Sequence, residues 1–193
     1  MKILKKLLGK LIRILYRFVY RFIPCQEKTI LFISFHGRGY SDNPMAIHQY
    51  LSKHSQYADY RCIYAIKNHK QKKLKIENAR IIEYFSIAYF FYLARSKYWI
   101  ANCKLPKYVL KKDSQVYLQT WHGTPLKKLA HDIEVPEGTT FYRSEMSVEE
   151  MRSTYDNDVS KYNYMISPSA FTTEVFQSAF AIERERLLSL IHI

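Results

Sequence analysis

A histidine in a tight turn is the first residue of this sequence with the chemistry of a catalyst. The segment "QTWHGTPLKKLAHD" (119–132) places His122 beside Gly123, directly after a β-forming run. A neutral imidazole takes a proton from a hydroxyl near neutral pH, and a glycine lets a substrate approach closely. Lys127 and Lys128 follow in an expected basic helix, and their ammonium groups could hold phosphates. The alternative is a loop histidine that only hydrogen-bonds the turn.

A second His-Gly loop competes with the first. The segment "HGRGYSDNP" (36–44) also follows an apolar run and makes His36 another candidate base. Asp42 and Asn43 stand just before Pro44, where such residues more often form turns or cap a helix than bind ligands. Residue types and spacing alone leave the choice between the two histidines open.

Alternating strands and helices would position both loops. We expect strands at 28–35, 60–66, 79–84, 97–103, 114–121 and 162–167. Helices are expected at 45–54, 86–96, 147–158 and 169–180, the last capped by Ser167 or Ser169. This alternation predicts an α/β fold with a mainly parallel sheet and helices on both faces. Ligands bind such sheets beyond the carboxyl ends of the strands, where both His-Gly loops fall.

The first 24 residues form a separate basic region. They contain seven basic residues and no acidic one, and Pro24 ends the pattern. One helical stripe is basic, formed by Lys2, Lys6, Lys10, Arg13, Arg17 and Arg21, and the opposite side is apolar, formed by Leu4, Leu8, Leu11, Leu15, Val19 and Phe22. The charges interrupt any transmembrane run and do not fit a cleavable signal peptide. We expect an amphipathic helix on an anionic membrane surface; the alternative is a solvated helix that packs its apolar side on the domain.

The composition fits one globular domain with an anionic partner. The 193 residues include 30 Lys and Arg against 17 Asp and Glu, a formal net charge of +13. Nucleic acid is not the expected partner, because the sequence has no helix-turn-helix, RRM, KH or zinc-finger pattern. The three cysteines and seven histidines lack the spacing of a disulfide framework or a metal site. We therefore expect reduced thiols in a protein that faces the cytosol, and no bound metal.

Three segments resemble one enzyme family. "LQTWHGTPLKKLAHD" (118–132) is very similar to the hallmark of the teichoic-acid CDP-glycerol glycerophosphotransferases, bacterial enzymes that prime or polymerise poly(polyol phosphate). "SFHGRGYSDNPMAIHQYL" (34–51) and "ISPSAFTTEVFQSAF" (166–180) resemble two further signatures of that family. The resemblance covers residues 28–182, and the family commonly carries a basic membrane-binding segment, which suits residues 1–24.

This resemblance implies a fold and a reaction. The fold would be of the GT-B type, with two Rossmann-like domains across a cleft, and residues 28–182 would form the acceptor-side domain. The reaction would transfer a polyol phosphate from CDP-glycerol or CDP-ribitol to a hydroxyl of a lipid-linked acceptor and release CMP, with no cofactor held by this chain. His122 matches the general base of the family, whereas His131 is expected to be structural. The expected substrate contacts are Trp121, Gly123, Thr124, Lys127, Lys128, Asp42 and Asn43.

The end of the sequence departs from the family pattern. Residues 183–193, "ERERLLSLIHI", read as an atypical tail from a truncation or a frame error, without the donor-binding domain. We therefore expect a fragment that is inactive alone; the alternative function is a non-catalytic, membrane-peripheral module that binds the acceptor. Either would act at the cytoplasmic side of the cell membrane. The sequence does not decide between glycerol and ribitol, between primase and polymerase, or the oligomeric state.

Overall fold

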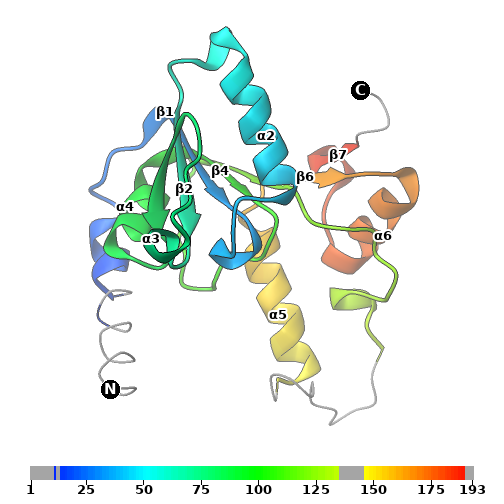
Figure 1. The fold of residues 1–193 in the computed structure, drawn as a ribbon. Helices are drawn as coiled ribbons and strands as arrows, with labels where there is room; N and C mark the ends of the chain where they lie inside the picture. Colours follow the sequence, from blue (N-terminus) through cyan, green and yellow to red (C-terminus); the bar gives the residue numbers. More distant parts are fainter. Residues whose placement is uncertain (1–10, 12–13, 135–145, 190–193) are drawn as a thin grey trace.

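A seven-stranded parallel sheet forms the centre of the molecule (Figure 1). The computed structural model describes residues 11, 14–134 and 146–189. The strands are β1 (Gln26–Ile33), β2 (Arg61–Ile66), β3 (Ala79–Glu83), β4 (Ser96–Ala101), β5 (Val116–Gln119), β6 (Tyr164–Ser167) and β7 (Leu187–Ser189). They lie in the order β3-β2-β1-β4-β5-β6-β7, and every neighbouring pair is parallel. The predicted α/β fold with a parallel sheet is confirmed.

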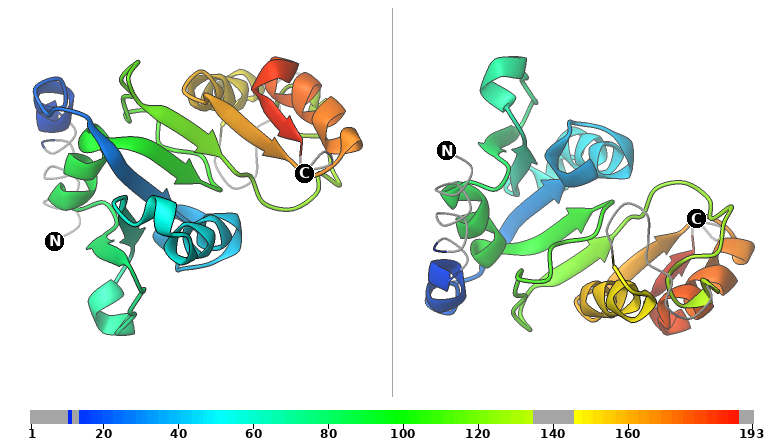
Figure 2. Two further views of the ribbon diagram at one scale, coloured as in Figure 1. Left: turned by 90° about the horizontal axis from the view of Figure 1, so that it is seen from above. Right: turned by 90° about the horizontal axis from the view of Figure 1, so that it is seen from below.

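Helices cover both faces of this sheet, as the sequence predicts. The α-helices are α2 (Asp42–Lys53), α3 (His69–Lys72), α4 (Ile87–Arg95), α5 (Val148–Val159) and α6 (Ala170–Phe180). Two single 3-10 turns matter for the site, η1 (Phe35–Gly37) and η3 (Ala130–Asp132). Figure 2 shows α2 on one face of the sheet, whereas α4, α5 and α6 lie on the other.

Strand β1 explains why the core divides into two layers. Leu31 and Ile33 point into a cluster on the side of α4, and Ile30 and Phe32 point into a second cluster on the side of α2. Leu31, Phe32 and Ile33 are completely buried. A strand that is apolar on both sides is stable only between two covering layers, so its continuous apolar run already indicated a central parallel strand.

Side-chain caps fix the starts of two helices. The Ser147 hydroxyl accepts a hydrogen bond from the backbone N–H of Glu150, and the Glu150 carboxylate accepts one from the N–H of Ser147. Ser169 caps α6 by accepting from the N–H of Thr172, at 3.1 Å. Of the two serines that the sequence offered as caps, Ser169 is therefore the one used, and Ser167 lies inside β6.

The structure corrects the sequence analysis in the segment after the His122 turn. The expected basic helix does not form, and the chain instead makes only the single turn η3 at Ala130–Asp132. A short helix is stable only when it buries an apolar stripe. Leu126 is 91% exposed, whereas Leu129 and Ala130 reach the core from an extended residue and from η3, so the segment buries these side chains without a continuous helical stripe.

Two further elements were not anticipated. The basic loop after β2 contains the short helix α3, and residues Leu187–Ser189 form strand β7 beside β6. Strand β7 carries the sheet past residue 182, where the sequence analysis placed the end of the domain. Three residues are too few for a periodic pattern, and β7 is defined by the partner strand that it joins.

The strand order reverses at one position in the sheet. The chain builds outward from β1 to β2 and β3, then returns to the other side of β1 to form β4 and continues outward to β7. The loops that follow β1 and β4 start side by side at this reversal. Parallel α/β sheets bind their ligands at this kind of reversal.

Only part of the basic region 1–24 can be compared with the prediction. Residues 1–10 and 12–13 lie outside the described residues, and residues 14–19 are helical. Within the described chain, none of the helices has the length and apolar character needed to cross a bilayer.

Candidate functional site

Three loops meet at the carboxyl ends of β1, β4 and β5. The loop after β1 touches the loop after β4, because the backbone N–H of His36 donates to the Cys103 sulfur at 3.1 Å. The Asn43 side chain, at the start of α2, donates to the Thr120 carbonyl after β5, at 3.3 Å. Both His-Gly loops therefore lie at one edge of the sheet, as the sequence predicts.

His122 occupies a sharp turn between two left-handed residues. Trp121 has φ 55° and Gly123 has φ 78°, and the positive φ explains the glycine. The His122 side chain is exposed, and its Nδ1 lies 2.5 Å from the carbonyl oxygen of Asn102. Because a carbonyl can only accept, Nδ1 carries the proton in the neutral ring. Nε2 then holds the free lone pair that a general base needs.

Two aromatic rings hold the His122 imidazole. The Trp121 indole stacks on it with ring centroids 5.1 Å apart, and the Phe35 ring meets it edge-on at 5.2 Å. Trp121 is itself anchored on α6, where it contacts the rings of Phe176 and Phe180 at 5.4 and 5.2 Å. The structure thus places Trp121 as a support for His122, and its expected contact with substrate stays a prediction.

Asn102 is the residue of this site that sequence reasoning missed. It follows β4 directly and is completely buried. Its side-chain oxygen accepts from the N–H of Phe35 at 2.8 Å, and its side-chain nitrogen donates to the Asp42 carboxylate at 2.5 Å. A polar residue at the end of an otherwise apolar strand was the available signal, because a buried amide requires hydrogen-bond partners.

The loop of His36 is packed much more tightly than that of His122. Phe35, His36 and Gly37 all have positive φ, at 43°, 55° and 80°. A methyl group on Gly37 would lie 2.7 Å from the Tyr84 side chain, so that only glycine fits. The backbone N–H of Lys67, after β2, closes the loop by donating to the Gly37 carbonyl at 2.7 Å.

Positive charges surround His36. Burial lowers the pKa of His36, and the charges of Lys67, Arg38, His122 and Lys104 lower it further. His36 is therefore mainly neutral near pH 7 and lies within electrostatic range of His122. This edge of the sheet combines two histidines with cations from three loops, an environment that attracts anions.

The other predicted contacts lie farther along the turn or are held by protein partners. Thr124, Lys127 and Lys128 are exposed, and Lys128 pairs with Glu134 at 2.5 Å. Asp42 and Asn43 hydrogen-bond Asn102 and the Thr120 carbonyl, so both connect the loops. The binding roles predicted for these five residues are not tested by the structure and stay predictions.

His131 has the contact of a structural residue. It lies in η3, and its Nε2 is 2.6 Å from the Asp156 carboxylate of α5. The link between η3 and α5 is extended by Arg152, whose guanidinium donates to the carbonyls of His131 and Ile133, both at 3.2 Å. His131 is thus tied to the neighbouring helix α5.

A buried carboxyl group supports the loop after β4. Asp158 of α5 accepts hydrogen bonds from the Leu105 N–H at 3.1 Å and from the Tyr162 hydroxyl at 2.6 Å. Burial raises the pKa of Asp158 to about 6. The loop that carries Asn102 and Cys103 is thereby fastened to α5 by a group that titrates in a physiological range.

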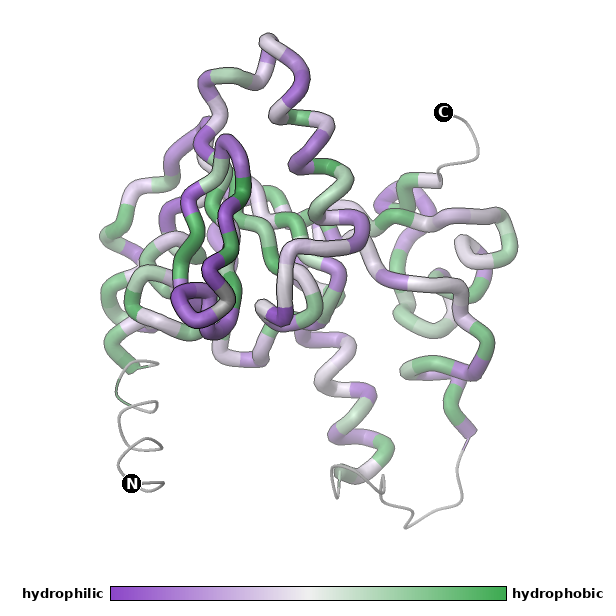
Figure 3. The backbone as a smooth tube through the Cα atoms, in the orientation of Figure 1, coloured by the Kyte–Doolittle hydropathy of each residue, from purple (hydrophilic) through white to green (hydrophobic). Residues whose placement is uncertain are grey.

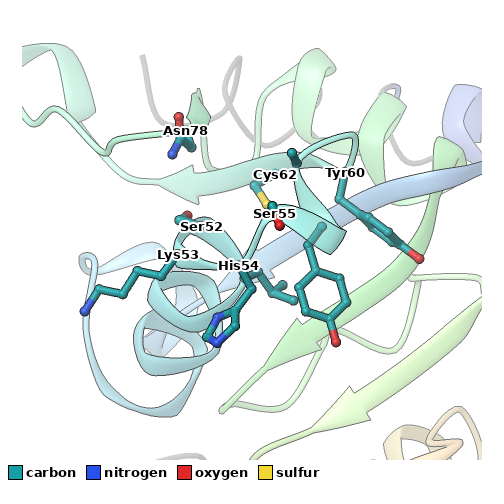
Figure 4. Close-up of a pocket in the computed structure, with 10 residues that line it drawn as sticks. Ser52, Lys53, His54, Ser55, Tyr60, Cys62 and Asn78 are labelled. Carbon is teal, nitrogen blue, oxygen red and sulfur yellow. The ribbon is translucent and has the colours of Figure 1, made fainter.

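A cavity lies at the opposite edge of the sheet. It has a volume of about 420 Å³ and is lined by the end of α2, including Ser52, Lys53 and His54, and by Tyr60, Cys62 and Asn78 (Figure 4). These last three residues lie at or near the amino ends of β2 and β3. Since ligands of parallel sheets bind at the carboxyl edge, the edge that carries His36 and His122 is the stronger candidate.

Among the described residues, no three His, Cys, Asp or Glu side chains are placed to hold one metal ion.

Known proteins match this chain over nearly its whole length. The family model described as CDP-Glycerol:Poly(glycerophosphate) glycerophosphotransferase matches residues 14–190. A teichoic acid poly(glycerol phosphate) polymerase of Bacillus spizizenii is 38% identical over 165 residues, which are 84% of this chain and 40% of that protein. The polymerase of Staphylococcus epidermidis is also 38% identical, over 84% of this chain and 22% of its own length. The chain thus spans less than half of these curated relatives.

Solved structures show the same fold. A structure of the wall teichoic acid polymerase TagF, in a variant soaked with CDPG, superimposes with a TM-score of 0.83 at 34% sequence identity. The match covers 92% of this chain and 41% of the TagF chain. A TagF structure described without variant or soak gives a TM-score of 0.82.

Proposed function

The chain belongs to the CDP-glycerol:poly(glycerophosphate) glycerophosphotransferase family, and on this premise we propose that it forms the acceptor side of a teichoic acid glycerophosphotransferase. The donor would be CDP-glycerol, the donor of this family, with CDP-ribitol as the alternative. The acceptor would be the terminal hydroxyl of a lipid-linked polyol phosphate. The observation that supports this role best is His122, whose Nδ1 is occupied by the Asn102 carbonyl while Nε2 remains available.

His122 would act as the general base of the transfer. Its Nε2 takes the proton of the acceptor hydroxyl while the hydroxyl oxygen bonds to the phosphorus that carries the glycerol. The bond from this phosphorus to the oxygen of CMP breaks, and CMP leaves. The products are an acceptor longer by one glycerol phosphate, CMP and a protonated His122.

The charge around His36 suits an anionic acceptor. Arg38, Lys67 and Lys104 come from the loops after β1, β2 and β4, and all three contribute positive charge at His36. A polyol phosphate carries one negative charge per repeat, so its last phosphates would be attracted to these cations while the terminal hydroxyl reaches His122. Lys127 and Lys128 remain predicted contacts farther along the acceptor.

The described start of the chain supports a peripheral membrane location. Tyr16 is buried and donates to the Leu110 carbonyl at 3.0 Å, which fastens the helix of residues 14–19 to the domain. Of the predicted apolar side, Leu11, Leu15 and Phe22 are 58 to 74% exposed and Val19 is 37% exposed. Ile14 and Phe18, which were not part of that prediction, are exposed as well, at 66 and 71%. This segment appears hydrophobic in Figure 3, next to the first grey trace.

Helix α4 extends this apolar surface. Ile87 is 76% exposed, and Phe91 follows one turn later. The two helices enclose a groove of about 200 Å³ lined by Leu15, Tyr16, Val19, Tyr20, Ile23, Ile87, Phe90 and Phe91. The side chains of Arg17 and Arg21 are exposed beside it. Apolar residues flanked by cations suit the cytoplasmic surface of an anionic membrane, where a lipid-linked acceptor would be found.

One experiment separates an enzyme from an acceptor-binding module. Two proteins would be assayed: the chain alone, and a fusion of the chain with the part of a TagF-type relative that lies outside the matched 41%. Both would receive CDP-glycerol and a lipid-linked glycerol phosphate acceptor in phosphatidylglycerol vesicles. We expect acceptor-dependent CMP release from the joined protein. Vesicle binding with no CMP release in either form would favour the non-catalytic module.

The same vesicles test the membrane location. Binding should weaken with salt and with the paired substitutions Phe18→Asp and Phe22→Asp, because both attraction to anionic lipid and apolar burial contribute. Equal binding to neutral and anionic vesicles at low salt would contradict this part of the proposal. A matched control is Tyr50→Asp, since Tyr50 is also exposed, at 54%, but lies on α2.

A further inference from the structure

We propose that Asn102 and Asp42 form a positioning pair that fixes the tautomer and orientation of His122. The inference rests on the proposed role of His122 as a base, and it assigns the reason why its Nε2 is free. Asn102 and Asp42 would not touch the reacting atoms. They would instead hold the carbonyl to which His122 donates, and the loop whose Phe35 ring lies against the imidazole.

The Asn102 carbonyl is available because it lies just beyond the strand pairing. The N–H of Asn102 still donates to the Ile33 carbonyl of β1, at 3.4 Å. The N–H of Thr120, from β5, donates to the preceding carbonyl, that of Ala101, at 2.8 Å. The Asn102 carbonyl is the next along the chain, and the hydrogen bond it receives is from His122 Nδ1. Its direction therefore depends on how the end of β4 is held.

The two bonds of the Asn102 side chain define its orientation. A backbone N–H can only donate, so the amide oxygen must face Phe35, and the amide NH₂ then faces the Asp42 carboxylate, which accepts. The short side chain of asparagine carries both the acceptor oxygen that the Phe35 N–H needs and the donor NH₂ that the Asp42 carboxylate needs. Aspartate would place two carboxylates in contact, and an aliphatic residue would leave buried groups unpaired.

Asp42 in turn is held in a conformation that needs support. Its φ is 60°, in the left-handed region, although it is the first residue of α2. The preceding Ser41 makes no side-chain cap at this helix start. A charge-assisted hydrogen bond from a buried amide stabilises such a turn. The pair thus links the start of α2, the Phe35 loop and the end of β4, all of which border His122.

Nitrogen NMR tests the pair without requiring turnover. In ¹⁵N-labelled protein above the pH at which its histidines titrate, long-range ¹H–¹⁵N spectra distinguish Nδ1–H from Nε2–H tautomers. We expect His122 to be mainly the Nδ1–H form. Asn102→Asp opposes two carboxylates and should reduce this form to less than about half of the molecules. Asp42→Ala, at a partly exposed position, is a milder variant with the same expected direction.

The decisive experiment exchanges the side chains of Asn102 and Asp42. Asn102→Asp combined with Asp42→Asn restores an acceptor for the Phe35 N–H and one amide–carboxylate hydrogen bond, so the Nδ1–H form should return. Asn43→Ala is the matched control, because it removes another hydrogen bond between the same loops, to Thr120, and should leave the tautomer unchanged.

Two results would overturn the inference. One is a wild-type tautomer in folded Asn102→Asp and Asp42→Ala proteins, and the other is an equal loss of the Nδ1–H form in Asn43→Ala. Failure of the proposed function is a separate outcome, because His122 could show the expected tautomer and yet catalyse no transfer.

Discussion

The two His-Gly loops share a dipeptide and an edge of the sheet, yet their surroundings differ. At Gly37 a side-chain carbon would collide with Tyr84, and the loop is closed by hydrogen bonds from Lys67 and to Cys103. At Gly123 nothing lies within 4 Å of such a carbon, and His122 is exposed. The loop of His36 is therefore packed against the domain at Gly37, whereas the turn of His122 is open at Gly123.

This difference teaches where the reactive group should be sought. Both histidines are exposed, so exposure alone does not separate them. A base needs a lone pair that can reach the substrate, and His122 has one ring nitrogen held by a carbonyl and the other available. His36 has its backbone bound to Cys103 and cations around its ring, so it fits the task of shaping an anionic site. The same residue types thus have different roles because their neighbours differ.

Replacing each histidine gives the largest expected contrast. His122→Ala should lower turnover at least about a hundredfold, because a positioned base contributes a factor of that size. His36→Ala should act mainly on acceptor binding, and His131→Ala should do little, because His131 pairs with Asp156 of α5. The measurement is CMP release by the fusion of this chain with the part of a TagF-type relative that lies outside the match. If the His122 variant keeps more than about a tenth of turnover, the base is wrongly assigned and His36 is next.

The two glycines should differ in stability. Gly37→Ala combines a positive φ with overlap on Tyr84 and should cost about 3 kcal/mol of unfolding free energy. Gly123→Ala meets only the unfavourable φ and should cost about 1 kcal/mol. Urea denaturation of both variants measures this contrast. Equal losses would show that the His36 loop is not packed as tightly as the structure indicates.

The pH dependence of the unfolding free energy tests how Asp158 holds the loop after β4. Asp158 binds its proton more tightly in the folded protein, with a pKa of about 6 against 3.8, so stability should fall as pH rises from 4 to 6. The contribution is about 2 kcal/mol, and Asp158→Asn should flatten it. Denaturation of both proteins at several pH values measures the difference between them. If the Asp158→Asn protein keeps the same dependence of unfolding free energy on pH, other groups cause that dependence.

The smallest expected effect is a shift in the titration of His36. Its pKa is lowered first by burial and then by nearby cations, so Lys67→Ala or added salt should raise it, but only part of the way back to its ordinary value. Histidine NMR signals followed against pH measure this. Lys127→Ala is the matched control from the His122 loop. A shift of the same size in that variant would contradict the assignment of Lys67 to the surroundings of His36.

The elements of the fold were largely predictable because burial on two faces leaves a clear pattern. The apolar run of β1 and the Ser169 cap of α6 have local causes, and both were anticipated. The expected helix after the motif was wrong, since Leu126 finds nothing to pack against. Strand β7 was missed because three residues become a strand only through pairing with β6.

By itself the sequence determined the family, the alternation of strands and helices, and the placement of two histidines beyond strand ends. These features depend on residues that are close in the chain, where turn chemistry and periodicity are local. Only the tertiary structure decided that the His36 loop is tightly packed and that the His122 turn is open. It also brought Asn102, 60 residues from Asp42 in the chain, into contact with that residue and with His122. Such contacts form because parallel strands deliver distant loops to one edge of the sheet, and no local pattern records which of them will meet.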